Sequence, residues 1–126
     1  MRRARQTAER ALQLESLDVG PTALALARLS AIALSAGLPA EALDHASSAQ
    51  QLVREHGLTE FVGLIALSHV ASLEATALRE RAREALAQAV RWIEAQAAKI
   101  DQPALRRSFL EDVPEHARLR RLLQAA

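Results

Sequence analysis

The chain has 126 residues and a formal net charge of +1 at pH 7, and half of its residues are hydrophobic although only 2% are aromatic. A charge so close to neutral disfavours a strongly basic nucleic-acid-binding protein, and the absence of cysteine excludes disulfides and thiolate metal ligands within the chain. This length suits one domain, and a core built from alanine and leucine favours helices over strands. We therefore expect an all-α fold.

Glycine and proline residues divide the first half of the chain into three predicted helices. Gly20-Pro21 separates a first helix from a second, and Gly37 can end the second helix in the left-handed backbone conformation. Pro39 suits the first turn of a third helix, which Gly57 can close. The first helix is expected over about residues 3 to 17, the second over residues 22 to 36, and the third from Pro39 to Gly57.

Four further helices are predicted in the second half, which makes about seven in all. Thr59 can cap a fourth helix over residues 59 to 75, and Thr76 can cap a long fifth segment over residues 77 to 100. Because every connection is short, consecutive helices should pack as antiparallel hairpins. The two remaining helices are expected to start at Asp101 with Pro103 and at Asp112 with Pro114.

Small residues recur along the chain at intervals of about 40 residues. In the predicted third helix, Ala42, Ala46 and Ala49 occupy positions i, i+4 and i+7, where a core-facing helix usually carries larger apolar residues. Small residues there let neighbouring helices approach closely, and a recurring helix–turn–helix unit of this length is typical of an α-solenoid. The matching windows are Ala4, Ala8 and Ala11 before it, and Ala82, Leu86 and Ala89 after it.

This pattern resembles the tetratricopeptide repeat, whose second helix carries small residues at the same spacing. In the best-matching unit, Leu26, Leu29 and Ser30 come before a turn at Gly37, and the window that starts at Ala42 follows it. The resemblance implies an antiparallel helix-hairpin solenoid that works as a protein-interaction module.

The second half of the chain continues this resemblance. A second unit fits with Leu67, Val70 and Ala71 if its turn is one residue shorter than that of the first unit. Residues 104–122 resemble the terminal segment of tetratricopeptide arrays in large bacterial signalling proteins, which implies that the chain is the C-terminal part of a larger regulatory protein. We expect residues 1–18 to be the second helix of a truncated repeat, residues 21–57 and 59–100 to be repeats, and residues 101–126 to be capping helices.

No group of residues has the sequence spacing of a catalytic or metal site. His45, His56, His69 and His116 form no HExxH pair, and Glu41 with His45 can share a helix face without making a site. There is no GxSxG motif, and the isolated glycines form no phosphate-binding loop. We expect no enzymatic activity, no cofactor and no metal. His69, in an otherwise apolar helix, is expected to be a hydrogen-bonded interior or groove residue.

The leading hypothesis is a non-enzymatic interaction module. In solenoids, the first helices of successive repeats line a concave surface that binds a peptide or a partner segment. The expected partner is a protein or peptide helix, or a second copy of the chain in a homodimer. The candidate groove residues are Ala27, Ala31 and Leu34 in the second helix, and Leu67 with Ala71, or Ser68 with Ser72, in the fourth helix.

Two other functions are open. A regulatory domain associated with nucleic acid could use two arginine clusters to contact phosphates. A small-molecule sensor could have its pocket between the second and fourth helices, around His69. The two arginine clusters are Arg2, Arg3 and Arg5, and Arg106, Arg107, Arg118, Arg120 and Arg121.

The N-terminal end of the truncated repeat is also expected to pair with another chain or with upstream repeats.

The sequence contains no predicted targeting or membrane segment. No apolar run reaches the length of a membrane-spanning helix, and the charged N-terminal residues are not followed by the apolar core of a signal peptide. We therefore expect a cytoplasmic protein that does not associate with membranes.

Overall fold

Six α-helices make up the part of the chain that the computed structural model describes, residues 18–126. No strand occurs among these residues, so the predicted all-α class is confirmed. The predicted first helix, with its alanine window and arginine cluster, lies outside the described residues, so six helices are seen where about seven were expected. The helices are α2 (Val19–Ser35), α3 (Pro39–His56), α4 (Val62–Ala75), α5 (Arg79–Ala98), α6 (Pro103–Glu111) and α7 (Pro114–Ala125).

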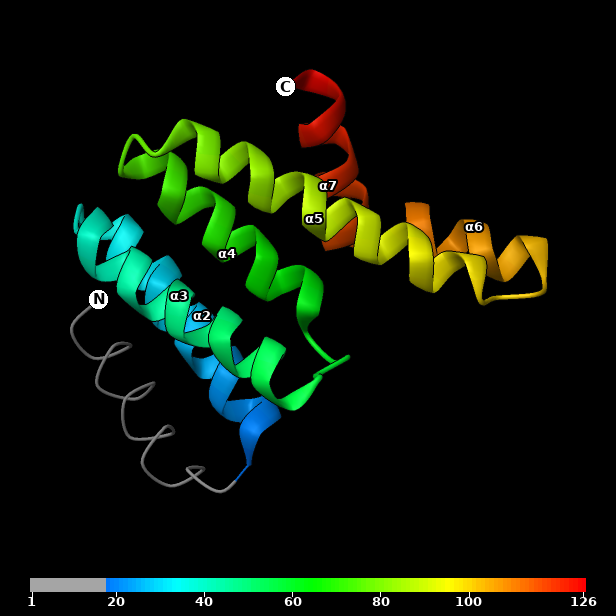
Figure 1. The fold of residues 1–126 in the computed structure, drawn as a ribbon, viewed down its shortest axis with the longest axis horizontal. Coiled ribbons are helices and arrows are strands. Elements are labelled where there is room, and N and C mark those ends of the chain that lie inside the picture. The colour runs from blue at the N-terminus through cyan, green and yellow to red at the C-terminus, as the bar shows by residue number, and fades with distance from the viewer. Residues whose placement is uncertain (1–17) are drawn as a thin grey trace.

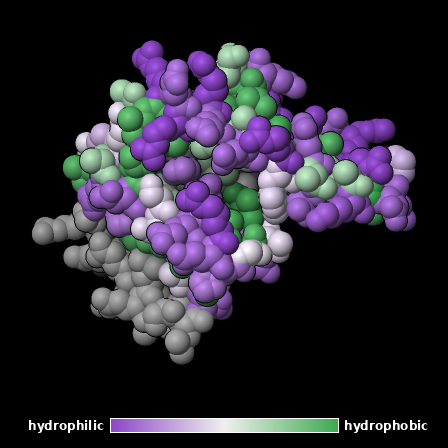
Figure 2. Space-filling model, in the orientation of Figure 1, coloured by the Kyte–Doolittle hydropathy of each residue, from purple (hydrophilic) through white to green (hydrophobic). Residues whose placement is uncertain are grey.

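The helices form two hairpins and a terminal pair. Helices α2 and α3 pack together, as do α4 and α5, and α4 also lies against both helices of the first hairpin (Figure 1). Among residues 18–126, α7 contacts α4 and α5, and α6 contacts α5 and α7. The C-terminal part of α5 projects beyond α4, with α6 running back beside it (Figure 1). On the face where α3 and α5 lie nearest the viewer, most side chains are hydrophilic (Figure 2).

Alanine lets α2, α3 and α4 pack closely. Ala42, Ala46 and Ala49 of α3 are each 0% exposed, and Ala49 lies in a cluster with Ala23 of α2 and Ile65 of α4. A leucine at these positions would hold the helices apart, since interaxial distances depend on the side chains at the contact. The predicted role of this alanine window, to admit a neighbouring helix, is consistent with this burial.

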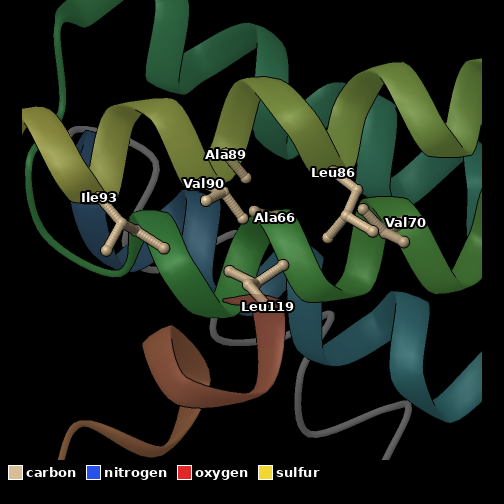
Figure 3. Packing of buried hydrophobic residues seen from close by; sticks show 7 residues of the cluster. All are labelled: Ala66, Val70, Leu86, Ala89, Val90, Ile93 and Leu119. Atoms are coloured by element: carbon tan, nitrogen blue, oxygen red, sulfur yellow. The ribbon is translucent and has the colours of Figure 1, made fainter. Parts of the chain in front are cut away.

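Larger side chains fill the second half of the core. Ala66 and Val70 of α4 pack against Leu86, Val90 and Ile93 of α5. Leu119, which is 0% exposed, points from α7 toward these residues (Figure 3). A single fully buried leucine is therefore the anchor that α7 places in the core.

A buried pair of serines joins the two hairpins. The hydroxyl of Ser30 in α2 donates a hydrogen bond to the carbonyl oxygen of Ala42 in α3, at 2.8 Å. The hydroxyl of Ser72 in α4 lies 2.9 Å from that of Ser30 and 2.8 Å from the carbonyl oxygen of Ser68. Both serines are 0% exposed, so these bonds are needed to avoid the cost of burying a hydroxyl group without a partner.

Glycines and prolines mark the helix ends as predicted. Gly37 and Gly57 follow α2 and α3 in the left-handed conformation, with φ angles of 76° and 58°. Pro39, Pro103 and Pro114 each stand in the first turn of a helix, where the missing N–H group is not needed. Helix α2 begins at Val19, three residues earlier than expected, so Gly20 and Pro21 lie inside its first turn.

The predicted threonine caps are wrong. Helix α4 begins at Val62, after Phe61 in the left-handed conformation (φ 62°), so Thr59 lies too far upstream to cap it. Thr76 ends α4 instead of starting α5, because its hydroxyl lies 2.9 Å from the carbonyl oxygen of Ser72 and 3.0 Å from that of Leu73.

Aspartate caps neither of the two terminal helices, which begin at the predicted prolines. Gln102 and Val113 occupy the cap positions of α6 and α7, and neither makes a side-chain capping bond. Asp112 ends α6, where its carboxylate accepts a hydrogen bond from the Ser108 hydroxyl at 2.6 Å. Proline alone is therefore the start signal that these two helices share.

The turns of the two hairpins have the same geometry, which corrects the predicted difference of one residue. Leu38 donates its N–H to the carbonyl oxygen of Ala33 at 2.8 Å, and the equivalent bond forty residues later measures 2.9 Å. Gly37 and Ala77 hold the same position and both have positive φ, 76° and 61°. The left-handed conformation costs a non-glycine residue about 1–2 kcal/mol, so Ala77 is a strained equivalent of the glycine.

The equal turns also change the register of the second unit. The residues of α4 that lie forty positions after Leu26, Leu29 and Ser30 are Ala66, His69 and Val70. Ala66 and Val70 are buried, whereas Ala71, which the shorter turn would place inside, is exposed. The predicted match through Leu67, Val70 and Ala71 is therefore wrong.

Reciprocal substitutions at the two turns test this equivalence. Ala77→Gly should raise the free energy of unfolding by about 1 kcal/mol because it relieves the left-handed strain, and Gly37→Ala should lower it by a similar amount. A β-carbon at Gly37 would meet no atom within 4 Å, so only the backbone contributes there. Denaturant titration measures both changes, and a loss of stability in Ala77→Gly would contradict the equivalence.

A substitution in the alanine window tests the close packing. Ala46→Leu should lower the free energy of unfolding by about 1–3 kcal/mol, because the added atoms have no space between the helices. Ala40→Leu, at an exposed position of the same helix, is the matched control and should change it by less than about 0.5 kcal/mol. Equal effects of the two substitutions in denaturant titration would show that the window is not tightly packed.

Candidate interaction groove

An open groove of about 260 Å³ runs between α2, α4 and α7. Its walls are mainly apolar, with two leucines and two exposed alanines contributed by α2 and α4 and one further leucine by α7. Glu74 and Arg118 are the charged residues on its rim. The lining residues are Ala31, Leu34, Leu67, Ser68, Val70, Ala71, Glu74, Arg118 and Leu122.

Five of the seven residues predicted to form a groove lie together in this one: Ala31, Leu34, Leu67, Ser68 and Ala71. Both of the alternative pairs proposed for α4 contribute residues to the groove, because Leu67, Ser68 and Ala71 all line it. Ala27 and Ser72 do not, since they are 4% and 0% exposed and belong to the packing between hairpins. Their small side chains serve close helix packing instead.

The sequence did not indicate the groove residues that α7 supplies. Arg118 and Leu122 reach the groove because α7 packs against α4, a helix far from it in the sequence. Glu74, at the end of α4, was also missed. The alternation of apolar and charged residues in α7 would have indicated an amphipathic helix, but not the helix against which it packs.

Helix α7 is held against the start of α4 by a close contact at Gly63. A β-carbon at Gly63 would lie 2.6 Å from Cγ of Glu115 and 3.0 Å from Cδ2 of His116. The His116 ring lies 4.5 Å from the Phe109 ring, and its Nδ1 is 2.9 Å from the carbonyl oxygen of that residue. The absence of a side chain at Gly63 therefore sets how closely α7 approaches, and with it the width of the groove.

Ser68 ties the two main walls of the groove together. Its hydroxyl donates a hydrogen bond to the carbonyl oxygen of Ala27 in α2, at 3.2 Å. This bond crosses from α4 to α2 at the base of the groove, where Ser68 is half-buried. The relative position of the walls is thus fixed by a polar contact as well as by apolar packing.

The groove continues into a second recess at the C-terminal end of α4. Glu74 and Leu122 line both spaces, and the recess has a volume of about 470 Å³. It adds Arg79 and Arg83, which stand one turn apart near the start of α5, and the apolar side chain of Leu86. Ala125 and Ala126 complete its lining.

His69 lies away from the groove, which corrects its predicted role as a hydrogen-bonded interior or groove residue. Its Nδ1 is buried and makes no hydrogen bond within residues 18–126. Burial lowers the pKa of the ring below its usual 6.5, and the charges of Arg54 in α3 and Arg81 in α5 lower it further. The sensor pocket predicted around His69 is therefore not the space between α2 and α4.

No group of three or more histidine, aspartate or glutamate side chains among residues 18–126 could hold a metal ion. His45 and Glu41 approach to 3.7 Å across one turn of α3, as their spacing indicated. Such a surface pair stabilises a helix by only about 0.5 kcal/mol. This contact is a local interaction within one helix.

The arginines of the C-terminal cluster are spread over several places. Arg106 donates to the carbonyl oxygen of Ile100 at 3.0 and 2.6 Å, and Arg120 donates to that of Leu110 at 3.5 Å. Arg118 lies at the groove. Arg106 and Arg120 are thus bound to carbonyl groups of the chain, whereas Arg118 borders the groove. No helix within residues 18–126 has both the length and the apolar character that crossing a membrane requires.

The burial of His69 predicts a loss of stability in acid. Because its pKa is lowered in the folded state, the unfolded chain binds more protons below about pH 6.5, and the free energy of unfolding should fall as the pH drops through that value. His69→Gln should show a shallower fall between about pH 7.5 and pH 5 in denaturant titrations. His56→Gln, at an exposed position of α3, is the control and should keep the steeper dependence.

Parallel curves of the free energy of unfolding against pH for the native chain and His69→Gln would contradict this prediction. They would show that the pKa of His69 is the same in the folded and the unfolded chain.

No protein-family model matches this chain, and neither the curated proteins nor the solved structures include a significant match.

Proposed function

We propose that this chain is a non-enzymatic protein-interaction module that holds an apolar helical segment of a partner in the groove between α2, α4 and α7. The observation that carries the proposal is the groove itself, whose predicted residues are brought together from two helices. An amphipathic helix in an apolar groove is a common mode of peptide recognition.

The residues of the groove suit a helix better than an isolated side chain. Ala31 and Ala71 are exposed at its edges, and the larger Leu34 and Leu67 are half-buried beside them. Small residues at the edges allow a helical backbone to come close, as alanine does within the core of this chain. Partner leucines would then bury against the groove leucines and gain about 25 cal/mol for each Å² of apolar surface removed from water.

The helix contacts support a tetratricopeptide-like hairpin array as the scaffold. Each hairpin turn has the same geometry at an interval of forty residues, and α4 packs on both helices of the preceding hairpin. Helix α7 contacts α4 and α5 much as α4 contacts α2 and α3. In such an array the concave side is formed by α2, α4 and α7, the three helices that line the groove.

A selection of random peptides tests the proposal. Displayed peptides of about 16 residues should yield sequences that bind the native chain as amphipathic helices. Ala71→Arg should weaken their binding by about tenfold or more, because the long charged side chain would fill the groove and lose hydration under a bound helix. Ala95→Arg, at an exposed position of α5 outside the groove, should bind them like the native chain.

Two further results bear on the outcome. Peptides that bind both arginine variants equally, or no selected peptides at all, would contradict a groove that recognises helices. Light scattering on a concentration series gives the mass in solution, and a dimer that Ala71→Arg dissociates would identify a second copy as the occupant of the groove.

A further inference from the structure

The recess beyond the groove has an unbalanced charge. Arg79 and Arg83 stand on one side and Glu74 on the other, and Arg118 lies at the groove rim. The joined space is therefore bordered by three arginines, against the carboxylate of Glu74 and the α-carboxylate of Ala126. A ligand that extends from the groove into the recess passes from an apolar surface to a positively charged one.

The two arginines of the recess are free to pair with a ligand. Neither guanidinium group makes a hydrogen bond or ion pair with another residue among 18–126. Both side chains are exposed, so pairing with a ligand requires no break of an internal contact. Arginine is well suited to such a role, since its fork of N–H groups matches a carboxylate.

The start of α5 adds to this positive potential. Helix α5 begins at Arg79, and its cap residue Leu78 makes no side-chain bond to the first N–H groups. The positive end of the helix dipole is therefore not satisfied by a capping side chain and favours a negative charge nearby. The C-terminal ends of α4 and α7 border the same recess and have the opposite sign, so the excess of positive charge comes from the arginines.

We infer that the partner segment is an amphipathic helix with acidic residues at one end, whose apolar face lies on the groove and whose carboxylates pair with Arg79 and Arg83. This inference rests on the proposed function and adds the charge and the polarity of the bound segment. The apolar end lies between α2 and α4, and the acidic end lies at the start of α5.

The peptide selection described above tests this inference when it is repeated on Arg79→Gln/Arg83→Gln. Peptides selected on the native chain should be rich in aspartate and glutamate at one end, and the double variant should lose that enrichment. It should bind an acidic-ended peptide about three- to tenfold more weakly, the range expected for two exposed ion pairs. Arg91→Gln/Arg107→Gln removes two exposed arginines that line neither space, and it should bind like the native chain.

The outcomes separate this inference from the proposed function. Selected peptides that depend on Ala71 but show no acidic end, or that bind the double variant as tightly as the native chain, would overturn the inference and leave the groove function standing. Equally tight binding of a peptide whose acidic residues are replaced by glutamine would also overturn the inference and leave the groove function standing. Without any peptide that depends on Ala71, both proposals fail together.

Discussion

The close approach of α4 to the first hairpin is the contact on which the rest of the structure depends. Ala42, Ala46 and Ala49 are fully buried in α3, and the hydroxyl groups of Ser30 and Ser72 meet between α2 and α4. Side chains of this size let α4 pack against two helices at once. The position of α4 then determines which of its faces remain for α5, α7 and the groove.

The shape of the groove depends on the packing of α7 against α4. Leu119 enters the core, and the missing side chain at Gly63 lets the first turn of α7 lie against the first turn of α4. Arg118 and Leu122 are brought to the groove by that contact. The terminal helix is thus a wall of the candidate site as well as a cover for the core.

The sequence predicted the helices better than their ends. Prolines and glycines locate the ends because they restrict or widen the choice of backbone dihedral angles. The threonine caps failed because a threonine hydroxyl can also donate to carbonyl groups at the end of a helix, as Thr76 does. Asp112 likewise stands at a helix end, where its carboxylate accepts a hydrogen bond from the Ser108 hydroxyl. The left-handed turn at Ala77 could not be predicted from the sequence, because tertiary packing and not the local preference of alanine holds that conformation.

The sequence by itself determined the helical class through its alanine and leucine content, and it determined the alanine window because helical periodicity places residues on one face without knowledge of the fold. The resemblance to a solenoid repeat indicated five of the seven proposed groove residues. The tertiary structure alone decided that Ala27 and Ser72 are buried, that His69 lies away from the groove, and that Arg118 and Leu122 lie beside it. These facts depend on which helices meet and at what rotation. Periodicity describes one helix at a time, so only the packed chain contains that information.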